Sequence, residues 1–241
     1  MINLSVIVPA YNFETKIINN LKILINKLDT FEEDYELIVI DDGSTDSTAN
    51  EIENFIKNNN KIKLLKNIKN QGKGYSVRKG FVSSTGKIKL FIDCDIPYLD
   101  RLEEMYLEVY KKKFDVCIIE RVFFLKDLKS LNFILRRLIS FIFNFIVKIF
   151  FVKNINDTQS GLKVFNSEIN VLNEYSLNKF LFDIEILMHC RKKNLNISIL
   201  KEHSDKTNIK YNSTFVFDLK IYYDVLKEFL KLLKLKKKFD G

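Results

Sequence analysis

Short apolar segments alternate with helix-like segments through the first 95 residues, and this alternation is what most restricts the folds open to the chain. Apolar runs at 2–8, 36–40, 61–65 and 88–92 have the length and composition of buried strands. After the first run, apolar residues recur at the spacing of one helix face: Ile17, Ile18, Leu21, Leu24, Ile25 and Leu28. The alternation predicts an α/β fold, a mostly parallel twisted sheet flanked by helices, with ligands at the carboxyl ends of the strands.

Polar loops follow three of these predicted strands, at 9–12 (PAYN), 41–44 (DDGS) and 93–95 (DCD). In such loops a carboxylate can accept hydrogen bonds from a nucleotide base or ribose, and a tyrosine ring can stack on a base. Each loop taken alone also fits an ordinary turn. Their common position at one edge of the sheet is what favours a nucleotide site.

Asp93 and Asp95 come directly after a buried strand, one residue apart. Because side chains alternate across a strand, we expect both carboxylates to face the same way from the lip of the sheet. Carboxylate oxygens are ligands that suit Mg²⁺ or Mn²⁺, so the pair predicts a metal ion that holds a diphosphate. The structural alternative is an acidic turn in front of Pro97.

Residues 70–74 (NQGKG) open another helical pattern. Backbone N–H groups at a glycine-rich helix start, with Lys73 beside them, are a plausible diphosphate seat. The pattern is not a Walker loop, since five residues instead of four separate Gly80 from Gly86. It is not a dinucleotide fingerprint either, because Val77 stands where the third glycine is required.

Four motifs in this order resemble those of inverting family 2 glycosyltransferases with the GT-A fold: VIVPAYN at 6–12, DDGSTD at 41–46, NQGKGYSVRKG at 70–80 and LFIDCD at 90–95. The third motif and DTQSGLKVF at 157–165 are similar to the polyprenyl- and dolichyl-phosphate glycosyltransferases, more to the glucosyl branch than to the mannosyl branch. The similarity extends over roughly residues 2–200.

The resemblance implies a set of donor contacts. Four residues would contact the nucleotide of a nucleotide-sugar: Pro9, Tyr11, Asp41 and Asp42. Asp93 and Asp95 would hold the diphosphate through Mg²⁺ or Mn²⁺, and Lys73 would bind the donor phosphate. The family usually has two acidic residues after the Tyr-Asn pair. Here Phe13 replaces the first and leaves Glu14 as the donor-binding candidate.

A nearly apolar segment, residues 138–152, lies in the second half of the chain. In and just before this segment, polar residues recur at every fourth position and form one stripe on a helix: Arg136, Ser140, Asn144 and Lys148. The segment is too short to cross a bilayer, so an interfacial helix region at 129–152 is expected, with a core helix as the alternative. The resemblance implies that Arg121, Arg136 and Ser140 lie near an acceptor phosphate.

The DTQSG segment at 157–161 fits a polar turn, but the resemblance implies that Asp157 and Gln159 border the sugar and the metal. Asp95 and Asp157 are therefore catalytic candidates, and Gln159 is a metal-ligand candidate. Asp183, early in a later helix, is either an ordinary first-turn acid or a catalytic base. A phosphate acceptor is already ionised near neutral pH, its second pKa being ~6, so we expect only a modest effect of Asp183→Asn.

The net charge of +8 fits an anionic partner. The scattered basic residues and the absence of tryptophan argue against nucleic acid, leaving a phosphate-bearing substrate and an anionic membrane surface. Residues 206–241 predict a basic amphipathic helix packed on or beside a glycosyltransferase domain at 1–205. Three well-separated cysteines and no leader pattern favour a peripheral protein on the cytoplasmic face of a membrane.

The leading hypothesis is metal-dependent transfer of a hexose, glucose from UDP-glucose in the first place, to a polyprenyl or dolichyl phosphate. A second hypothesis is transfer to a sugar hydroxyl during surface polysaccharide synthesis. A third is a non-catalytic module that binds a nucleotide-sugar or a membrane surface. The sequence leaves the sugar, the nucleotide and the lipid length open.

Overall fold

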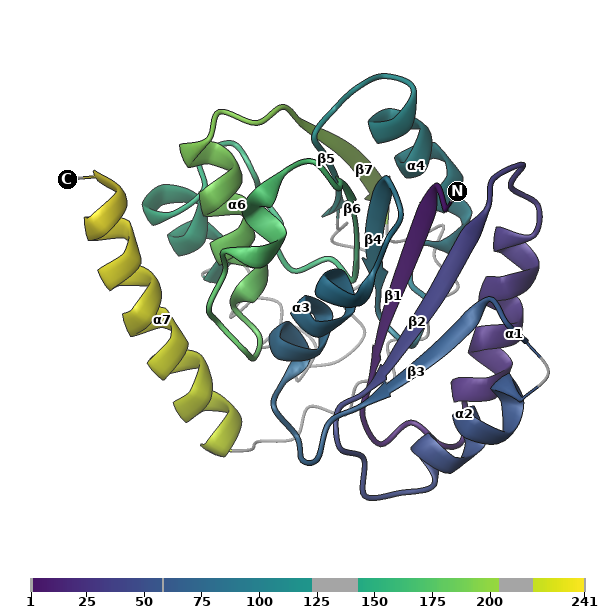
Figure 1. The fold of residues 1–241 in the computed structure, drawn as a ribbon. Coiled ribbons are helices and arrows are strands. Elements are labelled where there is room, and N and C mark those ends of the chain that lie inside the picture. The colour runs from purple at the N-terminus through teal and green to yellow at the C-terminus, as the bar shows by residue number, and fades with distance from the viewer. Residues whose placement is uncertain (1, 58, 123–142, 204–218, 241) are drawn as a thin grey trace.

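The computed structural model describes residues 2–57, 59–122, 143–203 and 219–240. Their centre is one seven-stranded sheet with the order β3-β2-β1-β4-β6-β5-β7 (Figure 1). The strands are β1 (Leu4–Ala10), β2 (Tyr35–Asp41), β3 (Ile62–Lys66), β4 (Ile88–Ile92), β5 (Val116–Val122), β6 (Leu162–Asn166) and β7 (Ile197–His203).

Within this sheet β6 runs against its two neighbours, β4 and β5, whereas the other described pairings are parallel. The register places Ala10 beside Asp41, and Ile92 beside Leu162. The carboxyl ends of β1, β2 and β4 therefore meet the amino end of β6 at one edge of the sheet. The prediction of a mostly parallel α/β sheet is confirmed.

Helices cover both faces of the sheet (Figure 1). They are α1 (Ile17–Leu28), α2 (Thr48–Ile56), α3 (Lys73–Ser83), α4 (Leu102–Tyr110), α6 (Phe182–Lys192) and α7 (Leu219–Asp240), with short 3₁₀ turns at Leu99–Arg101 and Asn170–Asn173. Alternate strand residues enter different cores because successive side chains point to opposite faces. Ile7, Ile38 and Phe91 pack with α3 and α6, whereas Val6, Leu37 and Leu90 pack with α1 and α4.

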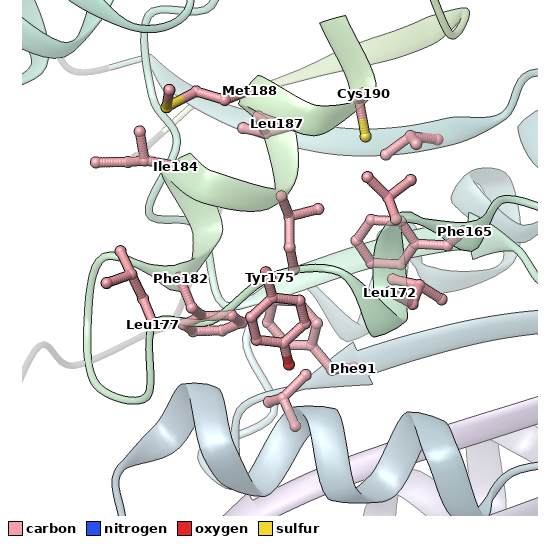
Figure 2. Packing of buried hydrophobic residues seen from close by; sticks show 14 of the residues in the cluster. Phe91, Phe165, Leu172, Tyr175, Leu177, Phe182, Ile184, Leu187, Met188 and Cys190 are labelled. Carbon is pink, nitrogen blue, oxygen red and sulfur yellow. The ribbon is translucent and has the colours of Figure 1, made fainter. Parts of the chain in front are cut away.

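Aromatic rings join the two halves of the chain beneath the candidate site (Figure 2). Phe91 of β4 and Phe182 of α6 have ring centroids 5.6 Å apart, and Tyr175 lies 5.7 Å from Phe182. Phe165 of β6 stacks on Phe91 at 6.4 Å. Burying a phenylalanine side chain stabilises the fold by about 1.5–3 kcal/mol, so this cluster fixes α6 firmly against the centre of the sheet.

Residues 143–150 form a helix within the apolar segment in which an interfacial helix was predicted. The beginning of that predicted region, with Arg136 and Ser140, lies outside the described residues. Phe151, just after this helix, meets Phe229 of α7 edge to face at 5.4 Å. Among the helices described, none combines the length and the apolar character needed to cross a bilayer.

Candidate active site

Asp93 and Asp95 lie in a tight turn directly after β4. The N–H of Ile96 donates to the carbonyl of Asp93 at 2.8 Å, and Ile96 has a φ of 47°. Strand alternation therefore does not set the directions of the two carboxylates, because β4 ends at Ile92, and their facing one ion stays a prediction. Burial, and then the charge of Asp93, raise the pKa of Asp95, as expected where two carboxylates repel each other.

Lys73, at the start of α3, forms an ion pair with Asp93, with Nζ 2.7 Å from Oδ1. Its ammonium group also lies 5.3 Å and 5.7 Å from the ring centres of Phe91 and Phe182. Burial lowers the pKa of Lys73, but the charges of Asp93 and then Asp183 outweigh it and raise the pKa overall. The candidate for the donor phosphate is therefore a fixed cation beside a candidate metal ligand.

The backbone N–H groups at the start of α3 are used by the protein itself. Gly72 donates its N–H to the Asp42 carboxylate at 2.8 Å. Gly74 and Tyr75 donate theirs to the carbonyls of residues 179 and 178, at 3.1 Å and 2.9 Å. The prediction that these amides seat a diphosphate is wrong for all three, and the Lys73 side chain is what this helix start offers to a phosphate.

Two of the predicted nucleotide contacts, Asp41 and Asp42, are almost fully buried at the end of β2. Asp42 accepts hydrogen bonds from Asn67 Nδ2 and from the N–H groups of residues 71–72, at 2.8–3.0 Å. Asp41 accepts from the N–H of Ser44 at 3.3 Å. Asp42 thus holds the glycine-rich loop in place, a role that the sequence did not indicate.

The other predicted donor contacts come from the end of β1 and the loop after it. Pro9 lies within β1, one residue before its end. Tyr11 is 44% exposed and free to meet a ligand with its ring. Glu14 instead accepts a hydrogen bond from the N–H of Ser47 at 2.7 Å, so its carboxylate steadies the start of α2.

Arg121 and Asp157, predicted for different roles, are bonded to each other across the end of β5. Arg121 Nε and Nη2 donate to the two carboxylate oxygens of Asp157 at 2.5 Å and 2.8 Å. Burial raises the pKa of Asp157, but the hydrogen bonds and charge of Arg121 outweigh it and lower the pKa overall. Asp157 is therefore an anion that orients Arg121, and its low proton affinity makes it a poor general base.

The loop from 157 to 161 rests against Asp93. The Asp93 N–H donates to the Gly161 carbonyl at 2.9 Å. A Cβ atom at Gly161 would come within 2.5 Å of Asp93 Oδ2, so a larger residue there would force the Asp93 carboxylate to move. Three buried polar atoms of this loop have no hydrogen-bond partner among the described residues: Thr158 Oγ1, Gln159 Nε2 and Ser160 Oγ.

Unsatisfied buried polar atoms cost about 1–3 kcal/mol each, so a cluster of three beside a candidate metal ligand points to a ligand site. The Gln159 amide carries an oxygen that suits a metal ion and N–H groups that suit a phosphate or sugar oxygen. No group of three or more His, Cys, Asp or Glu side chains in the described ranges is arranged to hold a metal. Asp93 and Asp95 are the fitting pair, because a cation would offset their repulsion.

A buried ion pair lies under the site, between Lys163 of β6 and Asp183 of α6. Lys163 Nζ is 2.8 Å from Asp183 Oδ1, and the two side chains are 0% and 2% exposed. Burial lowers the pKa of Lys163 and raises the pKa of Asp183. Asp183 was expected as a candidate base, but its pairing with Lys163 was not predicted, although a lysine inside the apolar run LKVF was a signal.

Residues 5–171 match the family described as Glycosyl transferase family 2. The chain belongs to glycosyl transferase family 2. Among curated family 2 relatives, the dolichyl-phosphate beta-glucosyltransferase of Dictyostelium discoideum is 33% identical over 82% of this chain, and that of Drosophila melanogaster 32% over 77%. These matches span 64% and 62% of the relatives, so the chain covers less than two thirds of their length.

Solved glycosyltransferase structures resemble the chain in fold at low sequence identity. Glucosyl-3-phosphoglycerate synthase from Mycobacterium tuberculosis, in complex with UDP, superposes with a TM-score of 0.66 at 16% identity, covering 97% of this chain and 79% of that one. Its complex with Mn²⁺, UDP and glucosyl-3-phosphoglycerate gives 0.58 at 17% identity, covering 83% and 70%. The GT-A fold predicted from the sequence motifs is confirmed.

Proposed function

We propose that the chain transfers a hexose, glucose from UDP-glucose in the first place, to a dolichyl or polyprenyl phosphate with inversion at the sugar. The observation that carries the proposal is the meeting of the Lys73–Asp93 ion pair, Asp95 and the unsatisfied 157–161 loop at one edge of the sheet. The names of the curated relatives support the choice of glucose and of a dolichyl phosphate acceptor.

On the donor side, the proposal assigns the nucleotide to the ends of β1 and β2, with Tyr11 stacking on the base. Asp93 and Asp95 would hold Mg²⁺ or Mn²⁺, and Gln159 is a further candidate ligand. When bound, the cation neutralises charge on the leaving diphosphate. Lys73, kept protonated by its carboxylate neighbours, adds a second positive charge at the same place.

On the acceptor side, the proposal assigns the lipid phosphate to the region of Arg121 and the 157–161 loop. Asp157 holds the guanidinium of Arg121 in a fixed plane, and the buried hydroxyl and amide groups of the loop can donate to phosphate oxygens. Arg136 and Ser140 are proposed as further acceptor contacts on the strength of the sequence resemblance alone.

The reaction requires an acceptor oxygen placed in line with the bond between the sugar and the diphosphate. A phosphate monoester carries that oxygen as an anion near neutral pH, its second pKa being ~6, so no side chain has to remove a proton. Asp183 fits this reading, because its carboxylate is already paired with Lys163 and buried. The protein's tasks are then to position the acceptor and to neutralise the diphosphate.

A membrane surface is proposed as the place where the lipid acceptor is met. Apolar side chains are exposed on helix 143–150 and on α7: Phe145, Ile149, Phe150, Tyr223, Leu226 and Leu230. A row of exposed lysines runs beside them on α7: Lys227, Lys231, Lys234 and Lys238. Such a combination suits a peripheral site on an anionic bilayer, which we place on the cytoplasmic face.

The test is a panel of UDP- and GDP-sugars offered with a short polyprenyl phosphate and, separately, with an oligosaccharide, with products followed by mass. We expect a polyprenyl phosphate that carries one glucose as the product from UDP-glucose. Asp95→Asn should lose most of this activity. Mn²⁺ binding, measured by calorimetry, should weaken in the same variant. Transfer to the oligosaccharide alone would contradict the lipid phosphate acceptor.

A further inference from the structure

One carboxylate on the C-terminal helix binds four consecutive backbone N–H groups. Glu228 Oε1 accepts from the N–H groups of Asn178 and Lys179 at 3.1 Å and 2.7 Å. Oε2 accepts from those of Phe180 and Leu181 at 3.0 Å and 2.9 Å. Glu228 is 5% exposed, so these charge-assisted bonds are shielded from water and hold the segment 178–181 against α7.

The same segment uses its other groups to hold the start of α3. The carbonyls of Asn178 and Lys179 accept from the N–H groups of Tyr75 and Gly74. The side-chain oxygen of Asn178 accepts from Arg78 Nη2 at 2.7 Å. Gly72 has a φ of 102°, and a Cβ atom there would lie 2.4 Å from the Asn178 carbonyl oxygen. One face of the segment is thus bonded to α7 and the other to α3.

Lys73 lies between Gly72 and Gly74, which both contact segment 178–181, and its ammonium group forms an ion pair with Asp93. A series of hydrogen bonds therefore runs from α7, through segment 178–181, to Gly74 and Tyr75, which directly follow Lys73 in α3. We propose that Glu228 is a positioning residue for the transfer reaction: it fixes segment 178–181, which fixes the start of α3 and so places Lys73. The inference rests on the proposed function for what Lys73 binds.

The chemistry of Glu228 cannot be reproduced by glutamine. A glutamine has a single side-chain acceptor oxygen, and its NH₂ group would face N–H donors that have no acceptor. The variant Glu228→Gln therefore keeps the shape of α7 but releases part of segment 178–181. A displaced Lys73 contacts the donor diphosphate less well, and a lost binding contact is seen as a raised KM for the nucleotide-sugar.

The experiment compares Glu228→Gln with Glu108→Gln in the full chain. Glu108 is a matched control because it is also buried and accepts from Ser198 and Lys112, but it lies on α4, which packs in the other core. For Glu228→Gln we expect faster amide hydrogen exchange at 72–76 as well as at 178–181, and a KM for the nucleotide-sugar raised about tenfold. Glu108→Gln should lower Tm and leave both readouts unchanged.

Faster exchange confined to 178–181 and α7, with an unchanged donor KM, would overturn the proposal and leave Glu228 a purely structural residue. If Glu228→Gln fails to fold, Asp224→Asn replaces it, because it removes the ion pair between α7 and Lys179 and leaves the core intact. The same pattern at smaller amplitude is expected there, and an unchanged donor KM would overturn the proposal.

The inference and the proposed function fail in different ways. Calorimetry of the wild-type chain with UDP and Mn²⁺ tests the donor site directly, and an absence of binding would refute the proposed function. Amide hydrogen exchange at 72–76 in Glu228→Gln tests whether Glu228 fixes the start of α3, and this measurement needs no ligand. Binding by the wild type, together with unchanged exchange in the variant, would refute the positioning role alone.

Discussion

The pairing of Lys163 with Asp183 places two opposite charges in the core directly below the candidate site. Breaking such a pair by removing one partner leaves an uncompensated buried charge, which costs more than the pair itself contributes. A loss of activity in Asp183→Asn would therefore mix a chemical effect with a folding effect. Stability has to be measured before any role in proton transfer is assigned to Asp183.

We predict that Lys163→Met lowers the free energy of unfolding by about 3–5 kcal/mol, because Asp183 is left buried without its cation. The double variant Lys163→Met/Asp183→Leu should recover much of this loss, since both charges are gone and the apolar volume is largely kept. Urea unfolding of the two variants and the wild type measures the difference. Equal destabilisation in the single and double variants would mean that the pair does not act as a unit.

Glu36, near the amino end of β2 and so at the opposite end of the strands from the site, offers a test by pH. Burial raises its pKa, but hydrogen bonds from Thr85, Ser5 and Lys63 outweigh it and lower the pKa to about 2. Because the folded pKa lies below the unfolded value, Glu36 stabilises the fold above pH ~4.5 and loses that effect as the pH falls toward 2. We expect Glu36→Gln to lower the free energy of unfolding by about 2 kcal/mol at pH 7. This figure is reduced because water screens the ion pair between Glu36 and the exposed Lys63 side chain.

The measurement is urea unfolding of the wild type and Glu36→Gln across this range of pH. The difference between them should shrink steadily between pH 4.5 and pH 2. A difference that stays constant would show that the Glu36 carboxylate gains nothing from its charge. The same test applies to Glu108→Gln as a second case, because the pKa of Glu108 is also lowered, first by its hydrogen bond from Lys112 and then by that from Ser198.

At the scale of elements, α7 has two separate faces. One face packs on the core through Leu232 and carries Glu228 to the segment before α6. The opposite face exposes Tyr223, Leu226 and Leu230 to solvent, at 65%, 57% and 52%. The face proposed to meet a membrane is therefore separate from the face that holds segment 178–181.

We predict that replacing Lys227, Lys231 and Lys234 by glutamine weakens binding to anionic vesicles by roughly 100-fold, since each lysine near such a surface contributes ~1 kcal/mol. Binding to zwitterionic vesicles should change little. The control replaces three lysines exposed elsewhere, Lys22, Lys57 and Lys111. Co-sedimentation at several salt concentrations measures both, and an equal effect of the two triple variants would contradict a specific membrane face on α7.

The elements of the first half could be predicted from the sequence, because their strands and helices each carry a clear period. The placing of β6 could not, since an apolar run of five residues says nothing about the direction of its strand. For the same reason the meeting of Lys163 with Asp183, and of Asp157 with Arg121, was out of reach. These contacts depend on where β6 is inserted in the sheet, between β4 and β5.

At the scale of the whole molecule, the candidate site is shared between two halves of the chain. Residues predicted in the first half, such as Asp93 and Lys73, are held there by segments of the second half, Gly161 and 178–181. The sequence motifs identified the residues of the site but not the contacts between the two halves of the chain that hold them. Hydrogen bonds between backbone groups leave no trace in residue type, apart from glycines at which a side chain would not fit.

Because β6 runs against its neighbours, the chain leaves the sheet at Val122 and returns at Leu162 on the same edge. An excursion that starts and finishes at one place can change in length and composition while the strands around it keep their register. If the proposed donor and acceptor sides hold, a chimaera with the 123–157 stretch of another family member keeps its sugar nucleotide and changes its acceptor.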